Sequence, residues 1–220
     1  MIETRRLAAA LVVALVIALA TFAPPASAED AGPFPFKAPA PGTVLVYSDG
    51  FQINFGRTTG RVTKATAGPK GAPTAATVEF VDAFMMQRLA RGRRTLTVEI
   101  KSEKPGFWPL RLGATQRFTM KISADGHPQQ SQRVVARIAK KVEMLTLAGK
   151  TRRVVRVDTD VRWKGRNGND RRSVVSYFHD LDLGFYVKRL YTRYGPEGRP
   201  RTPKIRELTS IGRTAVKPKR

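Results

Sequence analysis

The chain contains no cysteine in its 220 residues. This absence excludes disulfide bonds, metal sites built on thiolates and cysteine nucleophiles. It also excludes the lipid-modified cysteine that anchors bacterial lipoproteins. A domain without such cross-links must be held together by a packed core, and a chain of this length is long enough to bury one.

Histidines and carboxylates are also scarce, with two histidines and 17 Asp and Glu residues in the whole chain. His179 precedes Asp180 and Asp182, a combination of metal-ligating residue types. Neighbours on a strand alternate sides, so these three side chains cannot all face one ion. We therefore interpret them as solvated charges of a turn rather than as a metal site.

Motifs of the common catalytic classes are absent as well. The sequence has no G-x-S-x-G elbow of a serine hydrolase, and Gly68-Pro69-Lys70-Gly71 lacks the strand and helix that flank a phosphate-binding loop. Asp158 and Asp160 share a strand face but lie among arginines, which favours ion pairs. We predict that the protein is not an enzyme and that it has no cofactor, metal site or catalytic residue.

Long apolar runs are missing except for one between residues 7 and 20. Two arginines precede this run and Ala26-Ser27-Ala28 follows it, a pattern that predicts a secretory signal peptide over residues 1–28 with cleavage between Ala28 and Glu29. An uncleaved anchor is the alternative, but the run is shorter than the roughly 20 apolar residues that span a bilayer. We expect a periplasmic or secreted bacterial protein whose mature chain has no transmembrane span.

Negative charge is in short supply, because 40 Lys and Arg residues give the chain a formal net charge of +23. The signal peptide holds Arg5, Arg6 and Glu3, a net of +1, so its removal leaves 23 − 1 = +22. A charge of this size attracts polyanions. We expect anionic envelope lipids or polymers, or an acidic protein, as partners. Export and the lack of a nucleic-acid reader motif disfavour nucleic acid.

The basic residues are concentrated in a few clusters. Trp163 lies between two of them, Arg162 and Lys164, which places cations beside an aromatic ring. At an anionic membrane each nearby cation contributes about 1 kcal/mol to binding. An alternative is that the basic residues only solvate the surface. The candidates for contact with an anion are Arg91, Arg93, Arg94, Arg152, Arg153, Arg162, Lys164, Arg171 and Arg172.

Short alternating runs of apolar and polar residues follow residue 42, as is typical of β-strands. Turn signals at 48–50 and 166–170 predict hairpins. We therefore predict a mainly β fold, either an antiparallel sandwich or an open, curved barrel-like sheet. Val81, Met85 and Leu89 fall at helical spacing, which allows one short helix near 81–90.

The predicted organisation has four parts. The signal peptide at 1–28 is followed by a Pro- and Ala-rich linker at 29–42, a single β-domain at 43–212 and a basic tail at 213–220. Within the β-domain, residues 67–76 read as a loop rich in Gly, Pro and Ala. Residues 133–147 read mostly as strands, with a turn at the two lysines 140 and 141.

Four segments resemble, in this order, one protein family. They are similar to its opening P-x-G-T-x-x-x-Y strand (41–50), its W/F-P-L-x-x-G segment (107–113), its A-G hairpin with V-x-V (147–157) and its Y-W-Y-x-P-x-L-G-x-x-V-K segment (177–188). The resemblance is to uncharacterised β-rich bacterial envelope proteins, periplasmic or lipid-anchored. It implies a curved antiparallel β-structure and no established enzyme activity. The motif residues, which we interpret as architectural, are Trp108, Pro109, Leu110, Gly113, Ala148, Gly149, Tyr177, Gly184 and Lys188.

These features favour an exported, non-catalytic envelope protein that binds an anionic or lipid-like ligand or surface. A second hypothesis is a structural or assembly factor that docks on an acidic partner protein. A hydrolase on a β scaffold is the least favoured of the three. An apolar cavity enclosed by the sheet would favour a lipid carrier, whereas an interior filled by the protein's own side chains would leave only surface binding.

Overall fold

The computed structural model describes residues 32–69, 71–72, 74–101, 107–125, 127–165 and 167–214. The predicted signal peptide and its cleavage site between Ala28 and Glu29 lie outside these described residues. The secondary structure of the described part is all β. In chain order its strands are β1 (Thr43–Tyr47), β2 (Phe51–Thr59), β3 (Val62–Pro69), β4 (Ala76–Val81), β5 (Met85–Arg91), β6 (Arg94–Lys101), β7 (Thr115–Ala124), β8 (His127–Ile138), β9 (Glu143–Leu147), β10 (Lys150–Lys164), β11 (Asp170–Asp180), β12 (Phe185–Arg193) and β13 (Lys204–Arg213). Across these described ranges, no helix has the length and apolar character needed to cross a membrane.

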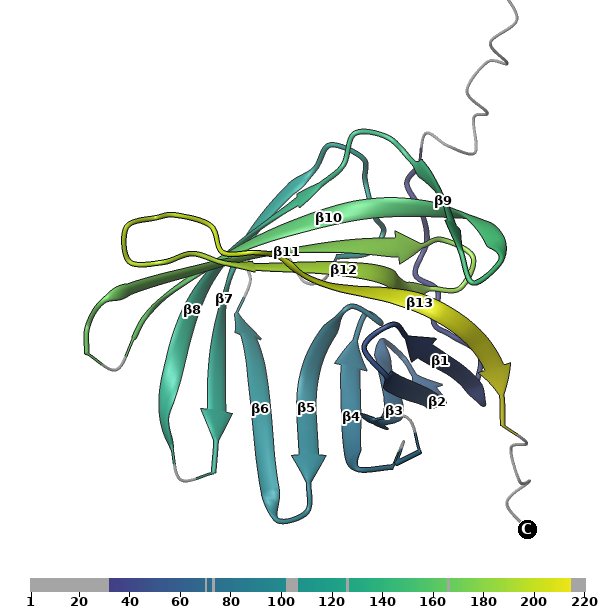
Figure 1. Ribbon diagram of the computed structural model, residues 1–220, viewed down its shortest axis with the longest axis horizontal. Coiled ribbons are helices and arrows are strands. Elements are labelled where there is room, and N and C mark those ends of the chain that lie inside the picture. The colour runs from purple at the N-terminus through teal and green to yellow at the C-terminus, as the bar shows by residue number, and fades with distance from the viewer. Residues whose placement is uncertain are drawn as a thin grey trace, which may run out of the picture. The chain divides into compact units, whose positions relative to one another are not determined.

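The strands form a closed antiparallel barrel (Figure 1). Each strand from β1 to β7 pairs with the next, β8 pairs with β10, and β10 to β13 pair in turn. The ring of 12 strands closes where β13 pairs with β1. The prediction of an antiparallel β fold is confirmed, but the sandwich is wrong and the sheet is closed rather than open.

Closure depends on β10, the longest strand at 15 residues. Its whole second part, Val154–Lys164, pairs with β11 on one side. On its other side Lys150–Val154 pairs with β9 and Val157–Trp163 pairs with β8. Alternation along a strand indicates which residues share a face, but it does not indicate which strands are neighbours. Closure is therefore a property that the local pattern could not supply.

The short helix allowed near residues 81–90 does not form. β4 ends at Val81, β5 starts at Met85, and Asp82 and Ala83 between them have φ angles of 59° and 49°. These left-handed backbone angles are incompatible with a right-handed helix. The N–H of Phe84 donates to the carbonyl of Val81 at 3.1 Å, which closes a tight turn. The apolar residues at helical spacing thus belong to the two arms of a hairpin.

The other local predictions fare differently. The turns at 48–50 and between β10 and β11 join hairpins, and residues 133–147 form β8 and β9 on either side of the two lysines, as predicted. Besides β5, β3 is a strand that the sequence analysis missed. Its last residues were assigned to a loop because the stretch 67–76 is rich in Gly, Pro and Ala. Hydrogen-bonded pairing with β2 and β4 on both sides keeps it in the sheet as far as Pro69.

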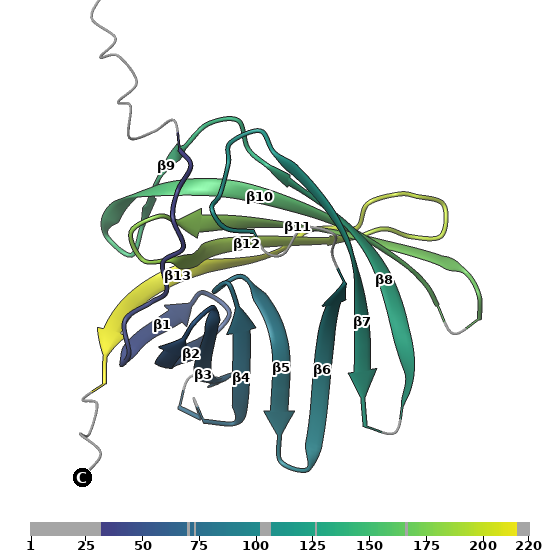
Figure 2. The same cartoon turned by 180° about the vertical axis from the view of Figure 1, so that it is seen from behind.

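The core consists of two clusters of buried side chains, the first mainly from β1 to β4 and β10 to β13, the second mainly from β7, β8 and β10. Figure 2 shows the ring of strands from behind, with β10 to β13 on one side and β1 to β8 on the other. In the first cluster the ring of Phe185 packs edge-on against Phe55 and Phe80, at centroid distances of 4.8 and 5.1 Å. The second combines Trp108 and Leu110 with apolar residues of β7, β8 and β10. The protein's own side chains thus fill the core between these strands, which disfavours a lipid cavity enclosed there.

Part of the segment predicted as a linker belongs to this core. Phe34 is buried, and its N–H and C=O exchange hydrogen bonds of 2.9 and 3.0 Å with the backbone of Leu110. Residues 32–42 therefore pack against the domain rather than extend freely. The apolar side chain of Phe34 was the sequence feature that could have predicted the burial of this segment.

Candidate anion-binding site

One end of the barrel carries most of the predicted anion-contacting residues. Because neighbouring strands are antiparallel, the connections that follow β1, β3, β5, β7, β10 and β12 all lie at the same end, which we call the hairpin end. Lys164 and Arg171 flank the β10–β11 turn, and Arg91 and Arg94 flank the β5–β6 turn.

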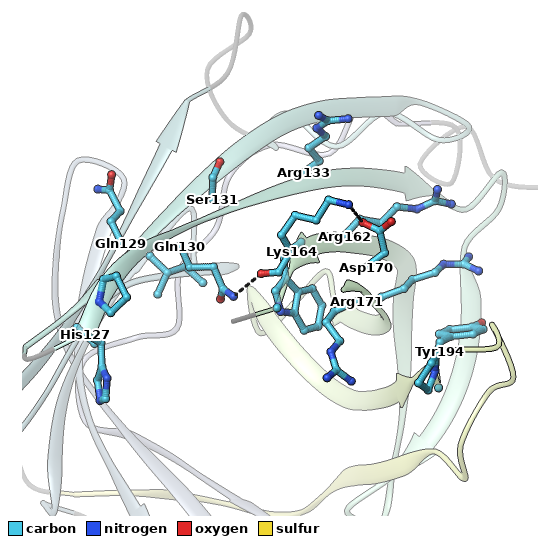
Figure 3. A pocket seen from close by; sticks show the side chains of 18 of the residues that line it. His127, Gln129, Gln130, Ser131, Arg133, Arg162, Lys164, Asp170, Arg171 and Tyr194 are labelled. Atoms are coloured by element: carbon cyan, nitrogen blue, oxygen red, sulfur yellow. Dashed lines mark hydrogen bonds and ion pairs between the residues drawn. The ribbon is translucent and has the colours of Figure 1, made fainter. Parts of the chain in front are cut away.

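A groove of about 1220 Å³ lies at the hairpin end, between the β7–β8 hairpin, the β10–β11 hairpin and the loop after β12 (Figure 3). Its polar lining includes His127, Gln129, Gln130 and Ser131 of the β7–β8 hairpin. Its five basic lining residues are Arg133, Arg162, Lys164, Arg171 and Arg172, and its only acidic lining residue among the described part of the chain is Asp170. The lining therefore carries a net charge of +4 by this count.

Three of these arginines form a row across neighbouring strands. Arg162 of β10 lies opposite Arg133 of β8 on one side and opposite Arg172 of β11 on the other. Adjacent strands are about 4.8 Å apart, so the row places three like charges in close succession. Like charges directly opposite one another destabilise a sheet. An anion bound to the row would remove the repulsion between these three charges.

One carboxylate partly neutralises the row from within the sheet. Asp160 accepts hydrogen bonds of 3.1 and 2.9 Å from Nε and Nη2 of Arg172, and longer ones of 3.4 and 3.5 Å from Arg162. Burial raises the pKa of Asp160, but the hydrogen bonds from Arg172 and Arg162 outweigh it and hold this pKa below its ordinary value of 3.8. The carboxylate therefore stays ionised and orients two guanidinium groups, as predicted for this arginine-rich face.

The remaining groove residues extend the basic surface. The guanidinium of Arg172 lies 4.3 Å from the ring centroid of Tyr194, which holds it at the groove wall. Lys164 forms an exposed ion pair of 2.9 Å with Asp170, of a kind that contributes little to stability and is readily exchanged. Arg171 lies beside this pair on β11 (Figure 3). These exposed and half-buried cations are available to a ligand.

The structure groups the predicted anion contacts unevenly. Arg162, Lys164, Arg171 and Arg172 all line the groove. Arg171 lies opposite Trp163 in the β10–β11 register, and so on the other face of the sheet from Arg162 and Arg172. Arg91, Arg93 and Arg94 lie apart, on the β5–β6 hairpin, and Arg153 lies on β10 next to the β9 pairing. Arg133, which sequence analysis missed, joins the groove because the β8–β10 register places it opposite Arg162. Only that register could have identified it.

Arg152 does not belong to this surface. Its side chain is only 9% exposed and its Nη1 donates a 2.8 Å hydrogen bond to Asp180. Asp180 also accepts hydrogen bonds of 2.8 and 2.9 Å from the backbone N–H groups of Asp182 and Leu183. The Arg152–Asp180 pair thus ties β10 to the turn after β11, and we leave Arg152 out of the anion-contacting set.

His179 is buried too, and the interpretation of His179 and Asp180 as solvated turn charges is wrong. The His179 ring is 0% exposed and packs 5.0 Å from the Trp108 ring and 6.0 Å from the Phe84 ring. Neither ring nitrogen has a hydrogen-bond partner among the described residues. Asp182, in contrast, is exposed as predicted. The described residues contain no group of three or more metal-ligating side chains.

The family-motif residues occupy architectural positions. Trp108 Nε1 donates a 2.8 Å hydrogen bond to the carbonyl of Asp82, and Lys188 pairs with Glu207 across β12 and β13 at 2.6 Å. Pro109 and Leu110 belong to the segment that pairs with Phe34, and Tyr177 packs among core residues. Ala148 and Gly149 form the β9–β10 turn, and Gly113 and Gly184 also have positive φ angles.

Gly184→Ala is expected to lower the free energy of unfolding by roughly 2 kcal/mol or more. The φ of Gly184 is +76°, and an added Cβ would lie 2.5 Å from the carbonyl oxygen of Lys37 and 3.1 Å from the amide of Ala38. Gly149→Ala is the matched control, because its φ is +71° but no atom lies within 4 Å of its added Cβ. It should cost about 1 kcal/mol, the strain alone. Equal losses for both variants in urea unfolding would show that the close approach at Gly184 has no energetic effect.

The fold has relatives among solved structures. A protein named as an exported protein with a YmcC-like fold, from Bacteroides fragilis, matches with a TM-score of 0.50 and 9% identity over 82% of this chain and 100% of that one. The chain shares this fold. The hypothetical lipoprotein YmcC of Escherichia coli matches with a TM-score of 0.48 and 12% identity, over 76% of this chain and 82% of its own. A protein named as a lipoprotein from Parabacteroides distasonis gives 0.41 and 10%, over 82% and 98%.

Sequence comparison adds nothing to this likeness. No protein-family model matches the chain, and no curated protein does. At such low identities the YmcC-like fold indicates architecture alone.

Proposed function

We propose that this chain is an exported, non-catalytic envelope protein that binds phosphate-bearing anions in the groove at its hairpin end. The observation that carries the proposal is the row of Arg133, Arg162 and Arg172 across three neighbouring strands. A guanidinium presents paired N–H donors that match phosphate oxygens, and a row of them binds phosphate better than isolated lysines do. The signal-peptide pattern of residues 1–28 supports export.

The form of the site favours binding at the surface over carriage of an enclosed lipid. Two packed clusters fill the core, and the groove lining includes Arg, Lys, Gln and Ser side chains beside apolar ones such as Trp163. In the envelope, phosphate-bearing partners of this kind are anionic lipid head groups and phosphate-containing polymers. The net charge of +23 supports attraction to such surfaces over a longer range.

Binding of the purified protein to phosphatidylglycerol vesicles tests the proposal. We expect co-sedimentation with these vesicles, none with phosphatidylcholine vesicles, and a progressive loss as salt screens the charges. Replacing two members of the row, in the variant Arg133→Gln/Arg162→Gln, should weaken binding roughly 30-fold, since each cation near the surface contributes about 1 kcal/mol.

The matched control is Arg117→Gln/Arg137→Gln, which removes the same charge from exposed positions of β7 and β8 that do not line the groove. Binding should change much less in this control. Equal weakening by both variants would show that net charge, and not the groove, drives binding. Failure to bind anionic vesicles, together with stoichiometric capture of an acidic protein, would favour the assembly-factor hypothesis instead.

A further inference from the structure

A second pocket, of about 350 Å³, lies at the hairpin end on the opposite wall of the barrel. It is lined by residues of β2 to β5, by Asp49 and Ala75 in the adjoining turns and by Arg206 of β13, and it shares no lining residue with the basic groove. We call it the slot. Its character differs from that of the groove, because most of its lining residues are apolar. Any ligand it binds therefore belongs to a different chemical class.

The walls of the slot continue the first core cluster. Ala67 lies opposite Ala76 in the β3–β4 register, and Leu89 lies opposite the core residue Val78. Alternation places these residues on the inner face of the barrel. Two small alanines opposite each other leave a space that larger side chains fill deeper in the barrel. Phe51 and Leu89, both partly exposed, flank this space.

Basic side chains stand at the mouth of the slot. Arg206 lies 4.1 Å from the ring centroid of Phe51 and its Nη2 is 2.7 Å from a carboxylate oxygen of Asp49, so its charge is already compensated. Arg91 is exposed and faces Arg94 across the β5–β6 hairpin. Within the described part of the chain neither Arg91 nor Arg94 forms an ion pair, so the β5–β6 hairpin places two uncompensated cations next to the apolar slot, with Arg91 in its lining.

We propose that the slot binds a single acyl chain with an anionic head group. The chain lies against Phe51, Ala67 and Leu89, and the head group lies at Arg91. The volume is at the lower end of the range for small-molecule sites, which are mostly apolar with a few placed polar groups. Binding covers apolar surface that the core leaves open, and the head group relieves the repulsion between Arg91 and Arg94.

A chain-length series measured by calorimetry tests the apolar part of this site. Octanoate, decanoate and laurate are titrated into the purified protein below their micelle-forming concentrations. Each added methylene that enters the slot should tighten binding about fourfold, until the slot is full. Dodecyl phosphate binding as tightly as laurate would assign the site to phosphate-headed lipids as well as to fatty acids. Dodecyltrimethylammonium, with a cationic head, should not bind. Affinity independent of chain length, or equal binding of the cationic amphiphile, would overturn the proposal.

Two variants test the assigned residues. Leu89→Gln keeps the size of the side chain but makes it polar, and should weaken laurate binding about tenfold. Arg91→Gln should weaken it about fivefold. Arg88→Gln is the matched control, because Arg88 is exposed on the same strand but does not line the slot. Unchanged affinity in Leu89→Gln, or equal weakening in Arg88→Gln, would contradict the site.

The groove variant Arg133→Gln/Arg162→Gln separates this proposal from the one above. It should bind laurate as the unaltered protein does, whatever its effect on vesicle binding. Loss of laurate binding in this variant would show that the acyl ligand lies in the groove and that the slot is not its site.

Discussion

Asp180→Asn is expected to lower the free energy of unfolding by about 3–5 kcal/mol, because it leaves the charge of Arg152 buried without a counter-charge. The side chains of Asp180 and Arg152 are 1% and 9% exposed, and their closest atoms are 2.8 Å apart. Asp180 also satisfies the backbone N–H groups of Asp182 and Leu183, which begin the turn into β12. A neutral amide satisfies these donors less well. Urea unfolding measures the loss.

Asp158→Asn makes the same chemical change on β10 and serves as the control. Its ion pair with Arg156 is 3.4 Å long, and the side chains are 35% and 44% exposed, so it should cost less than about 1 kcal/mol. Adding Arg152→Met to Asp180→Asn should recover part of the loss, because the unpaired charge is then gone. If the double variant is no more stable than Asp180→Asn, the loss comes from the turn and not from the buried charge.

Lowering the pH from 7 to 4 is expected to destabilise the protein by roughly 3 kcal/mol through His179 alone. Burial lowers the pKa of His179 from its ordinary 6.5 to about 4, and the nearby charge of Asp180 only partly opposes this shift. Below pH 6.5 the unfolded chain binds a proton that the folded protein excludes. Stability from this group is therefore complete above pH 6.5 and falls by about 1.4 kcal/mol per pH unit towards pH 4.

His179→Phe tests this assignment. The variant has no titrating group between Phe84 and Trp108, so its unfolding free energy should stay nearly constant between pH 6.5 and 5. His127→Gln, an exposed position at the β7–β8 hairpin, is the control and should keep the full decline. The pKa of Asp160 is held below its ordinary value of 3.8, so its contribution to stability starts to fall as the pH approaches that value, where the unfolded chain begins to bind the proton. The comparison of the two variants is therefore made between pH 6.5 and 5. An equal decline in His179→Phe would assign the acid sensitivity to another group.

Several features could be predicted from short stretches of sequence. The alternating runs after residue 42 indicated strands, and the turn signal at 48–50 indicated a hairpin, because both patterns depend on neighbours along the chain. The same holds for the ion pairing of Asp160, which lies among arginines on its own strand. The helix considered at 81–90 failed because a spacing of four residues also fits two arms of a hairpin when a tight turn lies between them.

The candidate sites were less accessible to sequence analysis. Arg162 and Arg172 were recognised as basic residues, but the row with Arg133 requires the pairing of β8, β10 and β11. The slot requires that Ala67, Leu89 and Arg206 lie side by side, although they come from β3, β5 and β13. His179 was interpreted as a turn residue because its neighbours in space, Trp108 and Phe84, are far from it in the sequence.

The β class, the hairpins, the lack of cysteine chemistry and the excess positive charge follow from local pattern and composition, as does the expectation of export. The closed barrel, the burial of the Arg152–Asp180 pair and the division of the basic residues between groove, slot and core do not. These depend on which strands pair and in what register, and a shift of one residue would turn every side chain to the other face. Contacts between distant strands therefore determine which of this protein's many cations are free to bind an anion.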